Sequence, residues 1–110
     1  MDARSAARKG DLPALKRIAK ANPSSFSTPD DNGWTPFHEA VRVGHKECVE
    51  TILFAPGSGE HLNRLTYTGV TPLNIAREVL GKDHEVTKFL IKMGAIDKHP
   101  NRKGTQNEEL

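Results

Sequence analysis

The sequence has few aromatic residues and no long run of apolar ones. Phe, Trp and Tyr make up 5% of the 110 residues, and apolar residues of all kinds make up 35%. A chain of this length can bury roughly 60 to 70% of its unfolded surface, so one small core is feasible. Ala, Leu and Val supply most of the apolar mass, which favours small helices packed closely together.

Disulfides, zinc sites and export signals are also missing. Cys48 is the single cysteine, so no internal disulfide can form, and no CxxC or Cys/His spacing suggests zinc. The first residues, MDARSAARKGD, carry charges where a secretory signal needs an apolar run. No stretch approaches the roughly 18 apolar residues of a membrane span. We therefore expect a protein of a reducing compartment, cytoplasmic or nuclear, with no membrane partner.

The sequence has no strong excess of charge of either sign. Its 16 basic and 14 acidic side chains give a net charge of +2, which is too balanced for general affinity for nucleic acid. A basic segment near the N-terminus leaves nucleic-acid binding as a minor hypothesis. That segment lies on a solvated helix face at ordinary charge density, so we expect no nucleic-acid partner. Its residues are Arg4, Arg8, Lys9, Lys16 and Arg17.

What the sequence does contain is an internal repeat. Residues 32–45 read NGWTPFHEAVRVGH, and residues 68–81 return to a close echo, TGVTPLNIAREVLG. The following halves, ECVETIL and EVTKFLI, also superpose once two extra residues in the second copy are skipped. The N-terminal SAARKGD matches the later part of the same unit. A period near 33 residues is typical of stacked repeat proteins, so we predict a partial repeat followed by two nearly complete ones.

Each full unit begins with a polar turn that leads into a helix. Gly33 and Gly69 lie in these turns, where a residue without Cβ can take a positive φ. A Thr-Pro pair follows, in which the Thr hydroxyl can cap the helix and Pro suits the first helical position. We predict a first helix over WTPFHEAVRV or VTPLNIAREVL. It should end at Gly44 in one copy and at Gly81 or residues 82–83 in the other.

A second helix in each unit carries one apolar stripe. In HKECVETILF, the residues Cys48, Val49, Ile52 and Leu53 recur at i, i+1, i+4 and i+5, which marks a single buried face. No unit can bury its stripe alone, so the units must stack. The equivalent stripes are Val86, Phe89, Leu90 and Met93 in the later unit and Leu12, Leu15, Ile18 and Ala19 in the first.

These residues resemble the ankyrin repeat, whose pattern is roughly D-x-x-G-x-T-P-L-H-x-A-A-x-x-G-H-x-x-V-V-x-x-L-L with a later Gly-Ala. The first full unit matches at Asp30, Gly33, Thr35, Pro36, Phe37, His38, Ala40, Gly44, His45, Cys48, Val49, Ile52 and Leu53. The second keeps Gly69, Thr71, Pro72, Leu73, Ala76, Val86, Leu90, Ile91, Gly94 and Ala95 but has Asn74 in place of the motif His. The resemblance implies an all-α ankyrin-repeat solenoid of stacked helix-turn-helix units joined by β-turn or hairpin loops.

The resemblance also sets the expected boundaries. We expect one domain over residues 1–97, with repeats at about 3–29, 30–65 and 66–97. The first unit lacks the TPLH turn and should be a capping helix pair, and the loop from Phe54 to Leu65 should be irregular. Residues 98–110 have no apolar periodicity and are predicted to be a flexible tail. The last repeat is uncapped, with Ile91 and Met93 exposed at an open end, and we expect a monomer.

Candidate catalytic groups are better explained as scaffold. In the family the motif His ties down backbone groups of the turn, and the resemblance implies this bracing role for His38. The alternative is a catalytic or metal-binding His38, but residue 42 is Arg, so the HExxH spacing fails. Cys48 lies on the apolar stripe, where we expect a core residue rather than a reactive thiol. No phosphate-binding loop or G-x-S-x-G motif occurs. We predict a non-enzyme without cofactor or metal.

The resemblance implies a docking surface for a partner protein, because turn tips and first helices line a concave face in this family. Trp34 leads the candidates, since an exposed Trp is otherwise a solubility liability, and Trp and Tyr are enriched among binding hot spots. The alternative for Trp34 is packing across the neighbouring turn. The alternative for Arg8 and Arg42 is solvated surface charge. The carried-over positions are Asp31, Asn32, Trp34, Tyr67, Thr68 and Val70 at the tips and Arg42, Val43, Glu78, Val79, Arg8 and Lys9 on the helices.

Two hypotheses of function follow. The first is a non-enzymatic protein–protein interaction module that binds an unidentified partner protein through the concave face. The second is an accessory ankyrin segment of a larger multidomain protein, for example an oxygenase-type enzyme, a hypothesis that rests on fold analogy alone.

Overall fold

The computed structural model describes residues 2–97, and the predicted tail over residues 98–110 lies outside these described residues. None of the helices in this part of the chain is long and apolar enough to cross a membrane. The helical segments are α1 (Ala3–Lys9), α2 (Leu12–Ala21), the 3-10 helix η1 (Pro23–Ser27), α3 (Pro36–Val43), α4 (Lys46–Leu53), α5 (Pro72–Ile75), the π-helical turn η2 (Ala76–Leu80) and α6 (Glu85–Lys92).

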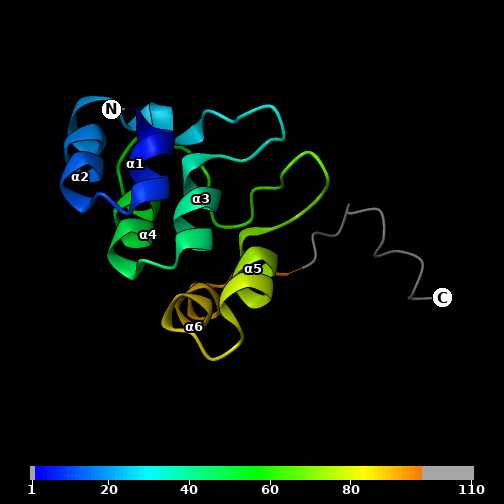
Figure 1. Cartoon of the computed structure of the whole chain (residues 1–110). Helices are drawn as coiled ribbons and strands as arrows, with labels where there is room; N and C mark the ends of the chain where they lie inside the picture. The colour runs from blue at the N-terminus through cyan, green and yellow to red at the C-terminus, as the bar shows by residue number, and fades with distance from the viewer. Residues whose placement is uncertain (1, 98–110) are drawn as a thin grey trace.

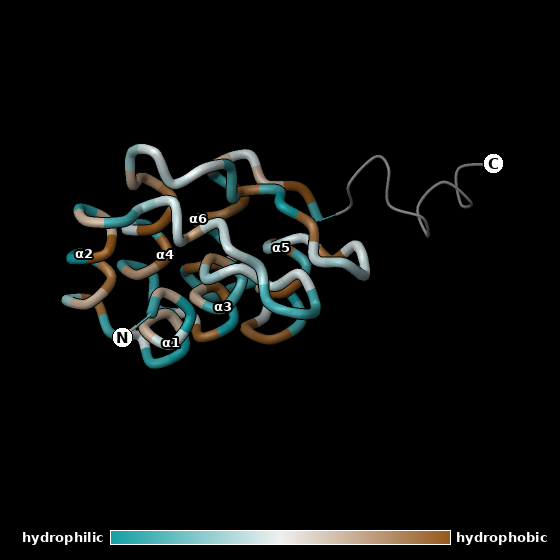
Figure 2. The backbone as a smooth tube through the Cα atoms, turned by 90° about the horizontal axis from the view of Figure 1, so that it is seen from above, coloured by the Kyte–Doolittle hydropathy of each residue, from teal (hydrophilic) through white to brown (hydrophobic). Residues whose placement is uncertain are grey.

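The helices form two rows (Figures 1 and 2). In one row α1 packs on α3 and α3 on α5, and in the other α2 packs on α4 and α4 on α6. Each helix of the first row is followed in the chain by its neighbour in the second row. Residues 2–97 contain no β-strand. The predicted all-α stack of helix pairs is therefore confirmed.

The first helix of each full repeat starts as predicted. The Oγ1 atom of Thr35 accepts a hydrogen bond from the backbone N–H of His38, and Pro36 takes the first helical position. Thr71 and Pro72 repeat this arrangement at the start of α5. Because a cap and its helix lie within a few residues of each other, the sequence specifies these helix starts locally.

The third repeat departs from the second in its first helix. α5 has only four residues and continues directly into η2, a π-helical turn. The chain then reverses at Gly81, whose φ of 95° lies in the region that favours glycine. The first helix of this repeat thus has nine residues, four in α5 and five in η2, against eight in α3. π-helical turns are rare in proteins and occur mostly as single turns within α-helices, as here.

The core lies between the two rows and includes most of the predicted stripe residues, although Met93 is exposed. Its largest fully buried side chains are Phe26, Phe37, Leu15, Ile52 and Leu90. Phe26 comes from η1, a helix that the sequence pattern did not predict. Cys48 is also fully buried, and burial raises the pKa of its thiol, as suits a core residue.

The loop from Phe54 to Leu65 is irregular, and the last repeat exposes Ile91 and Met93, as predicted. From Phe54 to Leu65 the chain forms neither helix nor strand, although Ser58 and His61 within it are buried. At the last repeat, 46% of Ile91 and 37% of Met93 are exposed, so the final helix presents apolar side chains that no other part of residues 2–97 covers.

Candidate protein-binding surface

Two equivalent loops, the first finger (residues 30–34) and the second finger (residues 66–70), project side by side next to α3 (Figure 1). The first is closed by a hydrogen bond from the Asp30 N–H to the Trp34 carbonyl (2.8 Å), and the second by the equivalent bond from Thr66 to Val70 (3.0 Å). The Asp30 carboxylate also accepts the N–H groups of Asn32 and Trp34. Burial opposes its ionisation, but these backbone N–H groups outweigh burial and lower the pKa of Asp30.

The two fingers are bonded to each other. The Tyr67 N–H donates to the Asn32 carbonyl (3.0 Å). Gly33 lies against the Tyr67 ring so closely that a Cβ at this position would come within 2.6 Å of Cδ1. Of the six predicted tip residues, Trp34 and Val70 are partly buried. The other four are exposed, and Tyr67 exposes 68% of its surface. They are Asp31, Asn32, Tyr67 and Thr68.

Trp34 is partly buried, so the expectation of a freely exposed Trp is wrong. Its ring packs against the core and lies 5.8 Å from the His38 ring, between centroids. The reason is its position at the base of the finger rather than at the tip, directly before Thr35, which caps α3. The exposed part of the ring borders a surface hollow.

That hollow brings four of the predicted residues together. We call it the Trp34 hollow; its volume is about 300 Å³. Asn74 and Ile75 also line it but were not predicted. They precede the predicted positions by three or four residues on the same helical segment, and this spacing could have indicated them. The complete lining is Trp34, Val70, Asn74, Ile75, Glu78 and Val79.

Arg8 and Arg42 lie elsewhere on the first row of helices. Both form ion pairs with Glu39, which was not among the predicted site residues. Glu39 contacts Arg8 of α1 (Nε to Oε2, 3.5 Å) and Arg42 of α3 (Nε to Oε1, 3.2 Å). The Glu39 side chain is only 7% exposed. The spacing of Glu39 and Arg42, three residues on one helix, is the signal that could have found this pair. Lys9 is exposed at the end of α1, and Val43 is partly buried at the end of α3.

His38 has the bracing role that was predicted. Its Nδ1 accepts the N–H of Thr35 (3.0 Å), and its Nε2 lies 2.8 Å from the carbonyl oxygen of Arg64. Since a carbonyl can only accept, Nε2 carries the proton and Nδ1 does not. Burial lowers the pKa of His38, which keeps this neutral form. The brace reaches beyond its own turn, to the segment that leads into the second finger.

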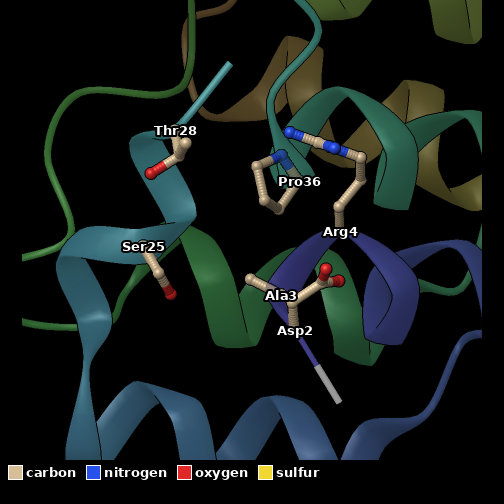
Figure 3. A pocket seen from close by; sticks show the side chains of 6 residues that line it. All are labelled: Asp2, Ala3, Arg4, Ser25, Thr28 and Pro36. Carbon is tan, nitrogen blue, oxygen red and sulfur yellow. The ribbon is translucent and has the colours of Figure 1, made fainter. Parts of the chain in front are cut away.

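A second hollow, near the N-terminus, is a weaker candidate. It measures about 160 Å³ and is lined by Asp2, Ala3, Arg4, Ser25, Thr28 and Pro36. In Figure 3 the Arg4 side chain extends past Pro36, with Ser25 and Thr28 on the facing segment. The Asp2 carboxylate caps α1, and the Ser25 hydroxyl donates to the Asn22 carbonyl. The polar groups of Asp2 and Ser25 are therefore used in local structure, whereas the Arg4 Nε is buried with no hydrogen-bond partner among the described residues. Throughout residues 2–97, no group of three His, Cys, Asp or Glu side chains is arranged to hold a metal ion.

The chain is similar in sequence to known proteins. The chain is 48% identical over 81 residues to the probable 26S proteasome regulatory subunit p28 of Saccharomyces cerevisiae, a match that covers 74% of this chain and 33% of that protein. It is 32% identical over 103 residues to protein phosphatase 1 regulatory subunit 27 of Mus musculus, covering 94% of this chain and 64% of that protein. The chain thus spans less than two thirds of the length of either relative.

A solved structure and a family model also match this chain. The crystal structure of the human ASB11 ankyrin repeat domain superposes with a TM-score of 0.71 at 30% identity, over 87% of this chain and 41% of that one. The family model for ankyrin repeats (3 copies) matches residues 4–103. Repeats of this kind mediate protein–protein interaction, and the chain belongs to the ankyrin repeat family.

Proposed function

We propose that the chain is a non-enzymatic interaction module that binds a partner protein through its concave face, the surface formed by the two fingers and the first row of helices. The module is a single domain over residues 1–97, monomeric, and acts in the cytoplasm or nucleus. The observation that carries this proposal is the Trp34 hollow, an apolar depression next to fingers that expose Tyr67 at their tip.

The residue types at this face support the proposal. Trp and Tyr are enriched among residues that contribute most to binding, because each buries a large rigid side chain at low entropic cost. Tyr67 makes a backbone bond to the first finger, yet 68% of its surface is exposed. The yeast and mouse relatives are named regulatory subunits, a description that fits proteins acting through other proteins.

The test is affinity capture of partners from the source cell, followed by measurement of the dissociation constant for a captured protein. Tyr67→Ala and Trp34→Ala should each weaken binding about tenfold or more, the equivalent of about 1.4 kcal/mol. Phe54→Ala is the matched control, since Phe54 is also an aromatic residue, 57% exposed, but lies at the end of α4 in the other row. Equal binding by all three folded variants would contradict the proposal.

A second candidate is an accessory segment of a larger protein. The observation in its favour is that the chain spans 33% of the yeast relative and 41% of the ASB11 domain. Sequencing the source transcript through the codon for Leu110 tests it, because a frame that continues into another domain would support it. The oxygenase-type version of this candidate stays a fold analogy.

A further inference from the structure

At one equivalent position of the concave face, the third repeat carries a different charge from the first two. With repeat shifts of 34 and 36 residues, Arg8, Arg42 and Glu78 align with one another. All three are exposed, and all lie in the first row of helices. The third repeat therefore reverses the charge that the first two share.

The two arginines are already compensated within the chain. Glu39 lies between them, 3.5 Å from one Nε and 3.2 Å from the other. The residue that aligns with Glu39 in the third repeat is Ile75, which is buried. At this position the third repeat thus has the opposite charge, and it has an apolar residue in place of the glutamate that pairs with the two arginines.

Within residues 2–97, Glu78 has no cationic partner. The ion pairs found within residues 2–97 involve Glu39 and Asp97, and neither an ion pair nor a hydrogen bond to the Glu78 carboxylate occurs among these residues. The nearest basic residue in sequence, Arg77, pairs with Asp97 at 3.1 Å. Glu78 is therefore an acceptor available to a partner.

The surroundings of Glu78 fit a long cationic side chain. The Trp34 hollow combines this carboxylate with the Trp34 ring and with the aliphatic surfaces of Val70 and Val79, of which Val79 is 56% exposed. An aromatic ring attracts a cation placed over its face. The methylene stem of Arg or Lys can at the same time cover apolar surface. A carboxylate at the rim then receives the charged end.

We infer that the Trp34 hollow binds an arginine side chain of the partner protein, with its guanidinium stacked on Trp34 and paired with Glu78. This inference rests on the proposed function of the concave face. Arginine fits better than lysine because its planar guanidinium both stacks on an aromatic ring and pairs with a carboxylate in two parallel bonds. An acidic side chain would be repelled by Glu78, and a purely apolar one would bury that carboxylate without compensation.

A displayed library of random peptides provides the probe, since the natural partner is unidentified. Peptides are selected on the folded chain, sequenced, synthesised and titrated while the indole N–H resonance is followed by NMR. The chain has one Trp, so this resonance reports on Trp34 without ambiguity. We expect arginine at one fixed position of the selected peptides. Replacing it with citrulline, its neutral isostere, should weaken binding about tenfold.

Variants of the chain separate the inference from general binding. Glu78→Gln should weaken the selected peptides about tenfold, and selection on Glu78→Arg should favour Asp or Glu at the position that held arginine. Glu47→Gln, an exposed glutamate on α4 outside the hollow, should bind as the unmodified chain does. Thermal unfolding of each variant verifies that it is folded.

Each other outcome would overturn the arginine inference, and one of them would overturn the concave-face proposal as well. Peptides that shift the Trp34 resonance but carry no fixed basic residue would overturn the arginine inference and leave the concave-face proposal standing. A fixed lysine in place of arginine would overturn the assignment to arginine. If no selected peptide shifted the resonances of Trp34 or Tyr67, both the inference and the proposed function would fall.

Discussion

At the residue scale, His38 explains why the family motif needs a histidine rather than another polar residue. Nδ1 accepts a hydrogen bond from the backbone N–H of Thr35 in the same turn. Nε2 donates one to the backbone carbonyl of Arg64, 26 residues along the chain. The ring must therefore be both acceptor and donor, and it must reach in opposite directions. A neutral imidazole does this, whereas a carboxylate or an ammonium group cannot.

Removing this brace should destabilise the protein. His38→Ala leaves a buried donor and a buried acceptor unpaired and opens a small cavity, so we expect a loss of about 2–4 kcal/mol in the free energy of unfolding. His38→Asn should lose less, because a short amide can still accept from Thr35. Urea denaturation measures both. A change below about 0.5 kcal/mol for His38→Ala would show that the brace contributes nothing net.

His61 should make stability depend on pH. It is 2% exposed, its Nε2 lies 2.9 Å from the Ser58 hydroxyl, and its Nδ1 is buried with no hydrogen-bond partner among the described residues. Burial, with the nearby Arg64 charge, lowers the pKa of His61 from 6.5 to about 4. The unfolded chain therefore binds the proton more readily than the folded one, and the folded state loses stability as pH falls from 6.5 to about 4.

The expected loss over this range is about 3 kcal/mol. Urea denaturation at a series of pH values measures it. His61→Phe, which can still stack on Phe37 as His61 does, should flatten the curve between pH 6.5 and 4. His45→Gln, at an exposed position of the same chain, is the matched control. A His61→Phe curve as steep as that of the unmodified chain would assign the pH dependence to other groups.

At the element scale, the two fingers behave as one unit because Gly33 permits their close contact. Its φ of 82° and the nearness of the Tyr67 ring both demand glycine. Gly33→Ala should therefore cost the strain of a left-handed residue, about 1–2 kcal/mol, and a further amount to displace the second finger. Gly94→Ala is the control, since φ there is 95° but a Cβ would meet nothing within 4 Å.

Thermal unfolding of the two glycine variants separates the contributions. A larger loss for Gly33→Ala than for Gly94→Ala, together with a shifted Tyr67 N–H resonance, is the expected result. Equal losses with an unmoved Tyr67 would mean that the fingers adjust freely and do not form one unit.

At the scale of the whole molecule, the stack is unequal because, within residues 2–97, only the middle repeat packs on a neighbouring repeat at each side. α3 packs on α1 and α5, and α4 packs on α2 and α6, whereas α6 packs on α4 alone in its row. The last repeat also leaves Ile91 and Met93 exposed. Since each repeat contacts only its neighbours, stability in such arrays is roughly a sum of repeat and interface contributions.

Amide hydrogen exchange should therefore be graded along the chain. We expect the buried amides of α3 and α4 to exchange most slowly, and those of α6 about tenfold faster or more, as a free-energy difference of about 1.4 kcal/mol requires. NMR or mass spectrometry of native-state exchange measures this. Uniform protection from α1 to α6 would show instead that the three repeats unfold as one cooperative unit.

The fold was predictable to the extent that its signals are local. Thr35, Pro36 and Gly44 define α3 through contacts within a few residues, and their equivalents define α5 up to its π-turn. η1 was not predicted, because its buried Phe26 belongs to no repeat position. The Ser58–His61 contact was missed for the same reason, since the loop from Phe54 to Leu65 has no counterpart in the motif.

The candidate site was predictable only in part, because its residues come from separate repeats. The motif placed Trp34 and Val70 at equivalent finger positions and Glu78 on a first helix, yet it could not show that these three residues line one hollow. It could not show either that Glu39 compensates Arg8 and Arg42 while Glu78 has no cation among the described residues. These relations depend on distances across the stack.

The amino-acid sequence therefore determines the repeat, the helix starts, the buried stripes and the family, since all of these follow from short-range periodicity and capping. The tertiary structure decides that Trp34 is partly buried and that His38 reaches the Arg64 carbonyl. It also decides that apolar side chains and a carboxylate with no ion pair among residues 2–97 share a hollow. Only the packing of one repeat on the next brings residues 34, 70 and 78 together, and that packing sets the chemistry the surface can offer.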